Sequence, residues 1–305
     1  MTGVQKVCVT EAESGQKLVQ FLSRRLDGRI PRSALMRWIR TGQVRIDGSR
    51  GKPFARVHSG QEIRIPPYSI EDTSPIAPAG EANPFVLSTV YEDSRLLVLA
   101  KPPGLATQPG SGLSDSVHDR LVARYASSAW RPSLVHRLDK ETSGLLLVAK
   151  TYASLQYLQQ LWKQRAVTKV YHAWVRGLCP WQDWTKLEDS FQESAHREHQ
   201  AVKSVKAESW AKVLHAHQGM SLLAVQLITG RKHQIRIQLA TRGYPVLGDQ
   251  KYGGDRSGQG LLLHATGLRF DGLSFELPPP WTGRFQVPAA LLKCRESFRD
   301  RSPVW

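Results

Sequence analysis

One stretch near the middle of the chain constrains its fold most: residues 134–150, which read LVHRLDKETSGLLLVAK. A carboxylate, Asp139, follows an arginine by two positions and precedes a polar turn at residues 142–144. The turn leads into residues 145–149, an apolar run with the length of a buried strand. A rigid strand after a short loop can hold one carboxylate in one place. The plain alternative is a surface Arg–Asp pair in front of a core strand.

Composition points to a binder of polyanions. The chain has 305 residues, enough for one large domain and a small one, and 41% of them are hydrophobic. It carries 42 Lys and Arg against 26 Asp and Glu, which gives a formal net charge of +16. No apolar run approaches the roughly 20 residues that span a bilayer, and the first residues lack a signal-peptide core. With three cysteines far apart in sequence, we expect a soluble cytoplasmic protein that binds nucleic acid and no membrane.

The basic charge is concentrated near the N-terminus. Residues 14–65 contain twelve Lys or Arg and only three Asp or Glu. Apolar residues at helical spacing predict a short helix over 18–26, and Pro31 is placed to open a second helix. Residues 44–48 indicate a strand and turn, and residues 60–67 a further strand. The arginines that we expect on the outer face are Arg32, Arg37, Arg40 and Arg45.

This arrangement resembles an S4 RNA-binding module, and residues 30–53, IPRSALMRWIRTGQVRIDGSRGKP, are similar to that family along their whole length. The alternative is a solvated basic face on a small α/β domain. Prolines are frequent in residues 66–84, which predicts a semi-rigid linker. We therefore expect an S4-like domain at 1–68, a linker at 69–84 and a catalytic domain at 85–305, with few contacts across the boundary.

Two later segments add candidate site residues. Residues 169–177 alternate as a strand does, and Tyr171 could offer its ring as a stacking surface, although a lone tyrosine in a strand is often a core residue. Residues 227–239 read LITGRKHQIRIQL, which predicts a turn and then a helix with cations at its start. An arginine near Asp139 would keep that carboxylate ionised at neutral pH. Arg231 and Lys232 are better read as phosphate contacts.

The stretch HRLDKETSG matches the signature of the RluA-type pseudouridine synthases, which convert uridines of structured RNA to pseudouridine. The pattern around Tyr171, the segment HQIR, and two late blocks at 243–253 and 261–265 resemble the same family in order and spacing. Residues 110–114 are similar to its S4-bearing, RluC-like branch, which acts on large-subunit ribosomal RNA. The resemblance implies that Asp139 is the essential residue, that Tyr171 is the active-site tyrosine and that Arg236 is the arginine partner of the aspartate.

The resemblance also implies an α+β catalytic domain with a mixed, largely antiparallel sheet and a central cleft, and a reaction without metal or other cofactor. The target uridine must leave its stack to reach Asp139, and Arg137 is placed to fill the vacated space. The other residues that we expect to contact RNA or line the substrate pocket are His136, Arg231, Lys232, His233 and, in the pocket, Leu263.

The expected partner is structured RNA, and a monomer without a protein partner is expected. The alternatives are a transfer RNA pseudouridine synthase and a non-catalytic RNA-binding protein. Histidines at 196, 199, 215 and 217 could suggest a metal site, but the segment that holds the first two is polar and lacks the ligand spacing of zinc enzymes, so they are predicted to be loop histidines.

Overall fold

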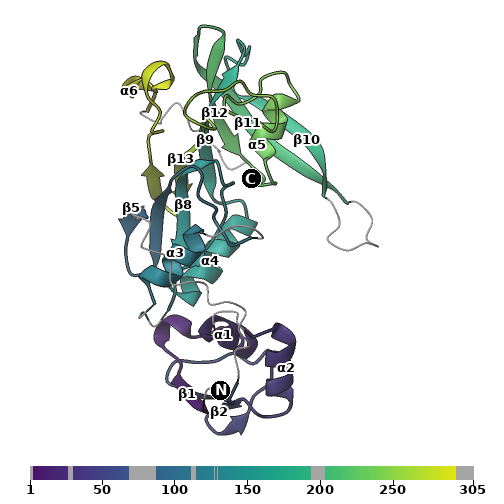
Figure 1. Cartoon of the computed structure of the whole chain (residues 1–305), viewed down its shortest axis with the longest axis vertical. Coiled ribbons are helices and arrows are strands. Elements are labelled where there is room, and N and C mark those ends of the chain that lie inside the picture. The colour runs from purple at the N-terminus through teal and green to yellow at the C-terminus, as the bar shows by residue number, and fades with distance from the viewer. Residues whose placement is uncertain are drawn as a thin grey trace.

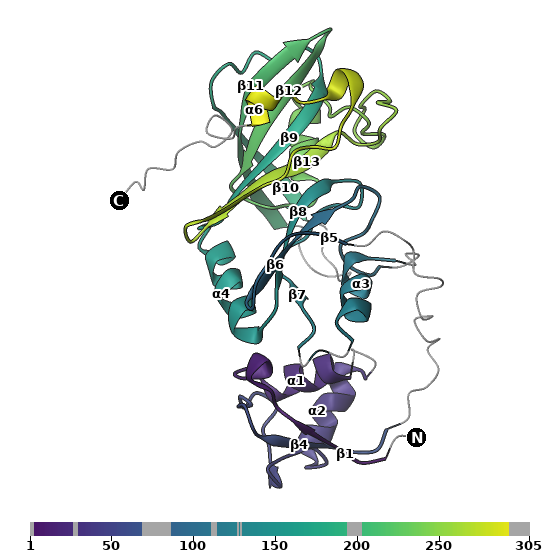
Figure 2. The ribbon, with the colours of Figure 1, turned by 90° about the vertical axis from the view of Figure 1, so that its left-hand side faces the viewer.

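The computed structural model describes residues 3–26, 30–68, 87–110, 115–126, 128, 130–193 and 203–292. They form a small body at the N-terminus and a larger one built on a long sheet (Figures 1 and 2). The predicted linker at 69–84 lies outside the described residues. None of the helices in these ranges is both long and apolar enough to cross a membrane.

The small body contains the helices and strands predicted for it. Its elements are β1 (Gln5–Cys8), a short 3-10 helix η1 (Glu11–Glu13), α1 (Leu18–Arg25), α2 (Arg32–Arg40), β2 (Arg45–Ile46), β3 (Ser49–Arg50) and β4 (Glu62–Ile65). The strands form one sheet in the order β1-β4-β2-β3. The apolar sides of both helices, including Phe21, Leu35 and Ile39, pack into one core. Pro31 directly precedes α2, and strand β1 was not predicted.

The larger body is organised by a ten-stranded sheet. Its strands are β5 (Ser88–Glu92), β6 (Leu96–Lys101), β7 (Ser133–Leu134), β8 (Ser143–Ala149), β9 (Thr168–Arg176), β10 (Thr185–Glu193), β11 (Lys203–His217), β12 (Met220–Leu227), β13 (Leu263–Phe270) and β14 (Leu273–Glu276). The main path runs β10-β11-β12-β9-β13-β8-β6-β5. Strands β13 and β8 pair in parallel, and the other strand pairs of the described sheet are antiparallel. The mixed, largely antiparallel α+β fold is confirmed.

Strand β8 is buried throughout because both faces of the sheet are covered around it. Leu146 and Val148 pack on one side with residues of α3 (Val117–Arg124). Leu145 and Leu147 pack on the other side with residues of α4 (Tyr152–Lys163). The remaining short helices are α5 (Gln234–Ala240), the 3-10 helix η2 (Gly283–Phe285) and α6 (Ala289–Leu292). The run after Asp139 is thus a fully buried central strand.

Gly144 joins the two halves of the sheet. It pairs with Ala265 of β13 at the start of β8, and its backbone has a φ of +118°, which favours glycine. A Cβ atom there would overlap the backbone of Ala265. Glycine at this position therefore permits the parallel contact that places the Asp139 loop beside β13.

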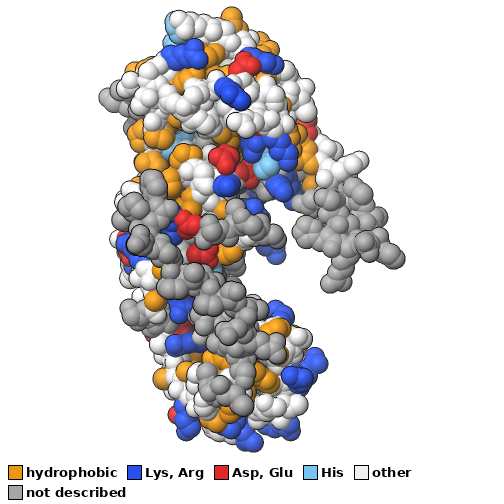
Figure 3. Space-filling view, in the orientation of Figure 1, with side chains coloured by type: hydrophobic (Ala, Val, Ile, Leu, Met, Phe, Trp, Pro, Cys, Tyr) orange, Lys and Arg blue, Asp and Glu red, His pale blue; other side chains and the backbone are white. Residues whose placement is uncertain are grey.

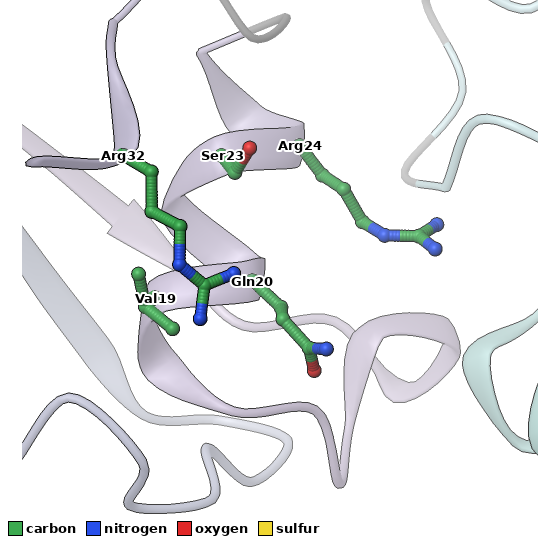
Figure 4. Close-up of a pocket in the computed structure, with 5 residues that line it drawn as sticks. All are labelled: Val19, Gln20, Ser23, Arg24 and Arg32. Atoms are coloured by element: carbon green, nitrogen blue, oxygen red, sulfur yellow. The ribbon is translucent and has the colours of Figure 1, made fainter. Parts of the chain in front are cut away.

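The two bodies touch through Arg24 of α1. Its guanidinium lies 4.4 Å from the ring centroid of Trp130 and donates a 2.6 Å hydrogen bond to Ser133 Oγ. Figure 4 shows Arg24 extending away from α1 at a pocket that Gln20 and Arg32 also line. Helix α4 also contacts η1. An arginine stacked on tryptophan thus links the two bodies at one place.

The histidine prediction is corrected in part. His215 and His217 lie in strand β11, with their rings 6.2 Å apart, because they continue the long hairpin with β12. Residues 196 and 199 lie outside the described part of the chain.

Candidate active site

The Asp139 loop, between β7 and β8, is fastened to the chain that follows β6. Thr107 Oγ1 donates to the carbonyl of Leu138 at 2.6 Å and accepts from its N–H at 3.1 Å. The N–H of Gly104 donates to the carbonyl of Lys140 at 2.9 Å. The residues on both sides of Asp139 are therefore fixed, and its side chain is left 20% exposed. The structure thus provides the positioned carboxylate that the sequence predicted.

Lys101, at the end of β6, is a third fastening point. Its ammonium group is buried and donates to the carbonyls of Pro102, Leu105 and Lys140 at 2.7–3.0 Å. Burial lowers the pKa of Lys101 to about 7, although the carboxylates of Glu141 and Asp139 act in the opposite direction. The sequence analysis did not identify this residue. A lysine directly after a buried apolar strand was the available signal.

Tyr171 lies on β9 with its ring in the core that also contains Ala173 and Leu263. The Tyr171 side chain lies on the face of β9 opposite to that of Trp174, which packs in a different cluster. This arrangement is expected from alternation along a strand. Burial and, second, the charge of Asp139 raise the pKa of Tyr171 well above its ordinary value. The phenol is therefore protonated at neutral pH. Leu263 is 3% exposed, so it packs in the core around Tyr171.

His233 is the ionisable group that the structure pairs with Asp139. Its Nε2 lies 3.9 Å from Asp139 Oδ1, and its Nδ1 lies 2.9 Å from the hydroxyl of Tyr252. Burial lowers the pKa of His233, and the positive charges of Arg236, Lys251 and Lys232 add to this against the effect of Asp139. The residue precedes α5 with a φ of +54°, a conformation that sequence reasoning missed. Histidine adopts it more readily than most residues do.

Arg236 forms a direct ion pair that the sequence did not predict. Its Nε and one terminal nitrogen donate to the two carboxylate oxygens of Asp249 at 2.6 and 2.7 Å. Asp249 is buried and also accepts from the N–H groups of Lys251 and Tyr252. Asp139 contributes to the raised pKa of Arg236 only after Asp249. The direct ion pair of Arg236 is therefore with Asp249, a carboxylate of a later loop, while the charge of Asp139 also acts on the guanidinium. The role of Arg236 as the arginine partner of Asp139 stays a prediction.

His136 makes contacts within the protein that the sequence did not predict. Its ring stacks on Trp162 with centroids 4.5 Å apart, and its Nε2 accepts from the N–H of Leu147 at 3.0 Å. Burial, assisted by the charge of Lys169, lowers the pKa of His136 to about 3. The ring is neutral, half-buried and held by the protein, and its contact with RNA stays a prediction.

The other predicted RNA contacts occupy two separate places. Arg137 and Lys232 are exposed in the larger body, and Arg231 is half-buried and donates to the carbonyl of Lys206. Four exposed arginines belong to α2 and β2 of the small body, whereas Asp139 belongs to the larger body. These residues are Arg32, Arg37, Arg40 and Arg45. Figure 1 shows α2 and β2 in the small body, below the long sheet. Figure 3 shows basic side chains around a histidine on the larger body and more basic side chains across the small body.

The fold and this carboxylate site define an RNA-modifying isomerase. Residues 95–241 match the family model described as RNA pseudouridylate synthase. Among the described residues no cluster of three or more His, Cys, Asp or Glu is placed to hold a metal ion. The chain belongs to the RNA pseudouridine synthase family, whose members isomerise uridine to pseudouridine in RNA.

Particular relatives resemble the chain over nearly its whole length. The ribosomal large subunit pseudouridine synthase C of Escherichia coli K12 is 35% identical, with 97% of each chain covered. The protein of that name from Salmonella typhi is 33% identical, with 98% of each chain covered. The structure of human RNA Pseudouridylate Synthase Domain Containing 4 shares the fold, with a TM-score of 0.54 and 23% identity over 63% of this chain and 88% of that one.

Proposed function

We propose that this enzyme isomerises specific uridines of large-subunit ribosomal RNA, with Asp139 as the essential catalytic carboxylate. The observation that carries the proposal is the fixed, partly exposed Asp139 in a chain similar from end to end to large-subunit synthases. Because ribosomal RNA is modified where ribosomes assemble, we propose a cytoplasmic location for the enzyme. We also propose that the enzyme acts as a monomer.

The reaction requires few catalytic groups. The C1′–N1 bond of uridine breaks, a C1′–C5 bond forms, the C5 proton leaves and N1 gains a proton. An ionised Asp139 can attack or stabilise the reacting nucleoside without a cofactor. Tyr171, kept protonated by burial and by Asp139, serves as a stacking surface and hydrogen-bond donor, since a protonated phenol does not accept the C5 proton. Arg236 contributes by holding the Asp249 loop next to His233.

RNA binding is divided between the two bodies. The S4-like small body offers its exposed arginines to the phosphates of a large RNA. Arg137, exposed two residues before Asp139, enters the gap that the flipped uridine leaves. The cation–π contact between Arg24 and Trp130 holds the RNA-binding surfaces of the two bodies at a fixed distance. RNA binding by both bodies suits a large RNA such as ribosomal RNA. Transfer RNA is the alternative substrate.

The test is a pseudouridine map of ribosomal and transfer RNA from cells with and without the protein. We expect sites in large-subunit RNA to disappear and to return with the wild-type gene. Asp139→Asn should fail to restore them, whereas Glu141→Gln, which changes an exposed acid of the same loop, should succeed. Loss of sites in transfer RNA alone would refute the ribosomal assignment, and restoration by the Asn variant would refute the role of Asp139.

A further inference from the structure

A cavity of about 400 Å³ opens next to the Asp139 site. It lies between the C-terminal end of β10, the N-terminal end of β11, the start of α5 and the loop after Asp249. Its lining residues are Ser190, Phe191, Gln192, Val205, Arg231, Lys232, His233, Ile237, Lys251 and Tyr252. His233 belongs to both places, because its ring lines the cavity while its Nε2 lies 3.9 Å from Asp139. The cavity is therefore one imidazole away from the proposed reacting carboxylate.

The lining combines aromatic rings with positive charge. Phe191 and Tyr252 are half-buried, and Lys232 and Lys251 are exposed. The residues that line the cavity include no Asp or Glu. Aromatic side chains beside cations are the combination with which proteins bind unpaired nucleotides, through stacking on the base and attraction of the phosphate.

Contacts with neighbouring side chains hold the Tyr252 ring of the cavity in place. The Tyr252 hydroxyl is bonded to His233 Nδ1, and the buried guanidinium of Arg236 lies 5.1 Å from the Tyr252 ring centroid. Arg236 is itself fixed by Asp249. This chain of contacts gives the ring one orientation before RNA arrives, which reduces the entropic cost of binding.

We propose that this cavity is a subsite for the nucleotide adjacent to the target uridine. In this proposal the strand whose uridine reaches Asp139 continues past His233, which lies beside both places, and its next nucleotide enters the cavity. The neighbouring base stacks on Phe191 and Tyr252, and its phosphate lies near Lys232 and Lys251. The volume suits one small ligand. The proposal rests on the role of Asp139 given above.

The test uses a stem-loop RNA around a mapped uridine and two analogues, each abasic at one neighbouring position. Single-turnover rates are measured at subsaturating enzyme. Phe191→Ala should slow the intact RNA about fivefold or more, the low end for loss of one base–aromatic stack. On one of the abasic RNAs, the variant and the wild type should react alike. Tyr157→Ala, which removes an exposed aromatic ring of α4, is the matched control and should match wild type on all three RNAs.

Variants of the two lysines test the contribution of the phosphate contacts separately from that of base stacking. Lys232→Gln and Lys251→Gln should weaken binding of intact and abasic RNA equally, each flattening the slope of log K against log salt by about 0.7. Phe191→Ala behaving as wild type on intact RNA, or losing equally on every RNA, would overturn the subsite. Wild-type turnover of the intact RNA in the same experiment reports on the proposed function independently.

Discussion

The buried pair of Arg236 and Asp249 supports a quantitative prediction about stability. Arg236→Ala leaves the Asp249 carboxylate, of which 1% of the residue surface is exposed, without its guanidinium. Removing one partner of a buried ion pair costs about 3–5 kcal/mol. The N–H groups of Lys251 and Tyr252 still donate to Asp249 Oδ1. We therefore expect a loss near the low end, about 3 kcal/mol.

The same helix region supplies a matched control. Arg242 pairs with Asp189 at 2.9 Å, but both side chains are about one-quarter exposed, at 27% and 26%. Exposed pairs contribute about 0–1 kcal/mol, so Arg242→Ala should cost about 1 kcal/mol or less. Asp249→Asn should also destabilise the protein, and the Arg236→Ala, Asp249→Asn double variant should lose much less than the two single losses combined.

The assay is urea and thermal unfolding of the full chain at pH 7, followed by near-ultraviolet circular dichroism and tryptophan fluorescence. For a body of this size, about 3 kcal/mol corresponds to a fall in Tm of about 6–12 °C. If Arg236 instead serves Asp139, Arg236→Ala should remove activity while changing Tm no more than Arg242→Ala does. That result, or additive effects in the double variant, would refute the buried-pair reasoning.

Four further predictions follow from the loop and strands around Asp139. Asp139→Asn should abolish tritium release from C5-labelled uridine RNA yet keep filter-binding affinity within a few-fold, because many cations share the binding; turnover by this variant contradicts the mechanism. Tyr171→Phe should fall between wild type and Tyr171→Ala in single-turnover rate, and an unchanged rate for Ala would make the ring a core residue only. Gly144→Ala should prevent folding to soluble protein, because a Cβ overlaps the backbone of β13; a variant with normal expression and Tm argues against that close approach. Burial lowers the pKa of Lys101 to about 7, against 10.5 in the unfolded chain, so the unfolded state binds more protons between these values. The free energy of unfolding should therefore rise with pH between about 7.5 and 10, with a slope of at most about 1.4 kcal/mol per pH unit. A Lys101→Met variant should lack this rise, and equal slopes for the two proteins would show that Lys101 is not buried as a neutral amine.

The sequence determined the local features of this protein well. The apolar run after Asp139 predicted β8, helical spacing predicted α1, residues 227–239 predicted α5, and alternation over residues 169–177 predicted β9. These patterns arise between near neighbours in the chain, and a strand or helix with one such pattern buries the same residues wherever it is placed. The composition likewise indicated a binder of polyanions, because net charge is additive along the chain.

The tertiary structure alone decided the partners of charged groups. Arg236 was predicted beside Asp139, but the fold brings Asp249 nearer, from a loop thirteen residues away. His136 is stacked on Trp162, a contact that the sequence did not predict, while His233 lies next to Asp139. Lys101 is fastened to Lys140, 39 residues later. A guanidinium or an imidazole binds whichever acceptor the folded chain places within a few ångströms, and that distance depends on how β6, β8, β9 and β13 pair, which periodicity within single strands does not specify.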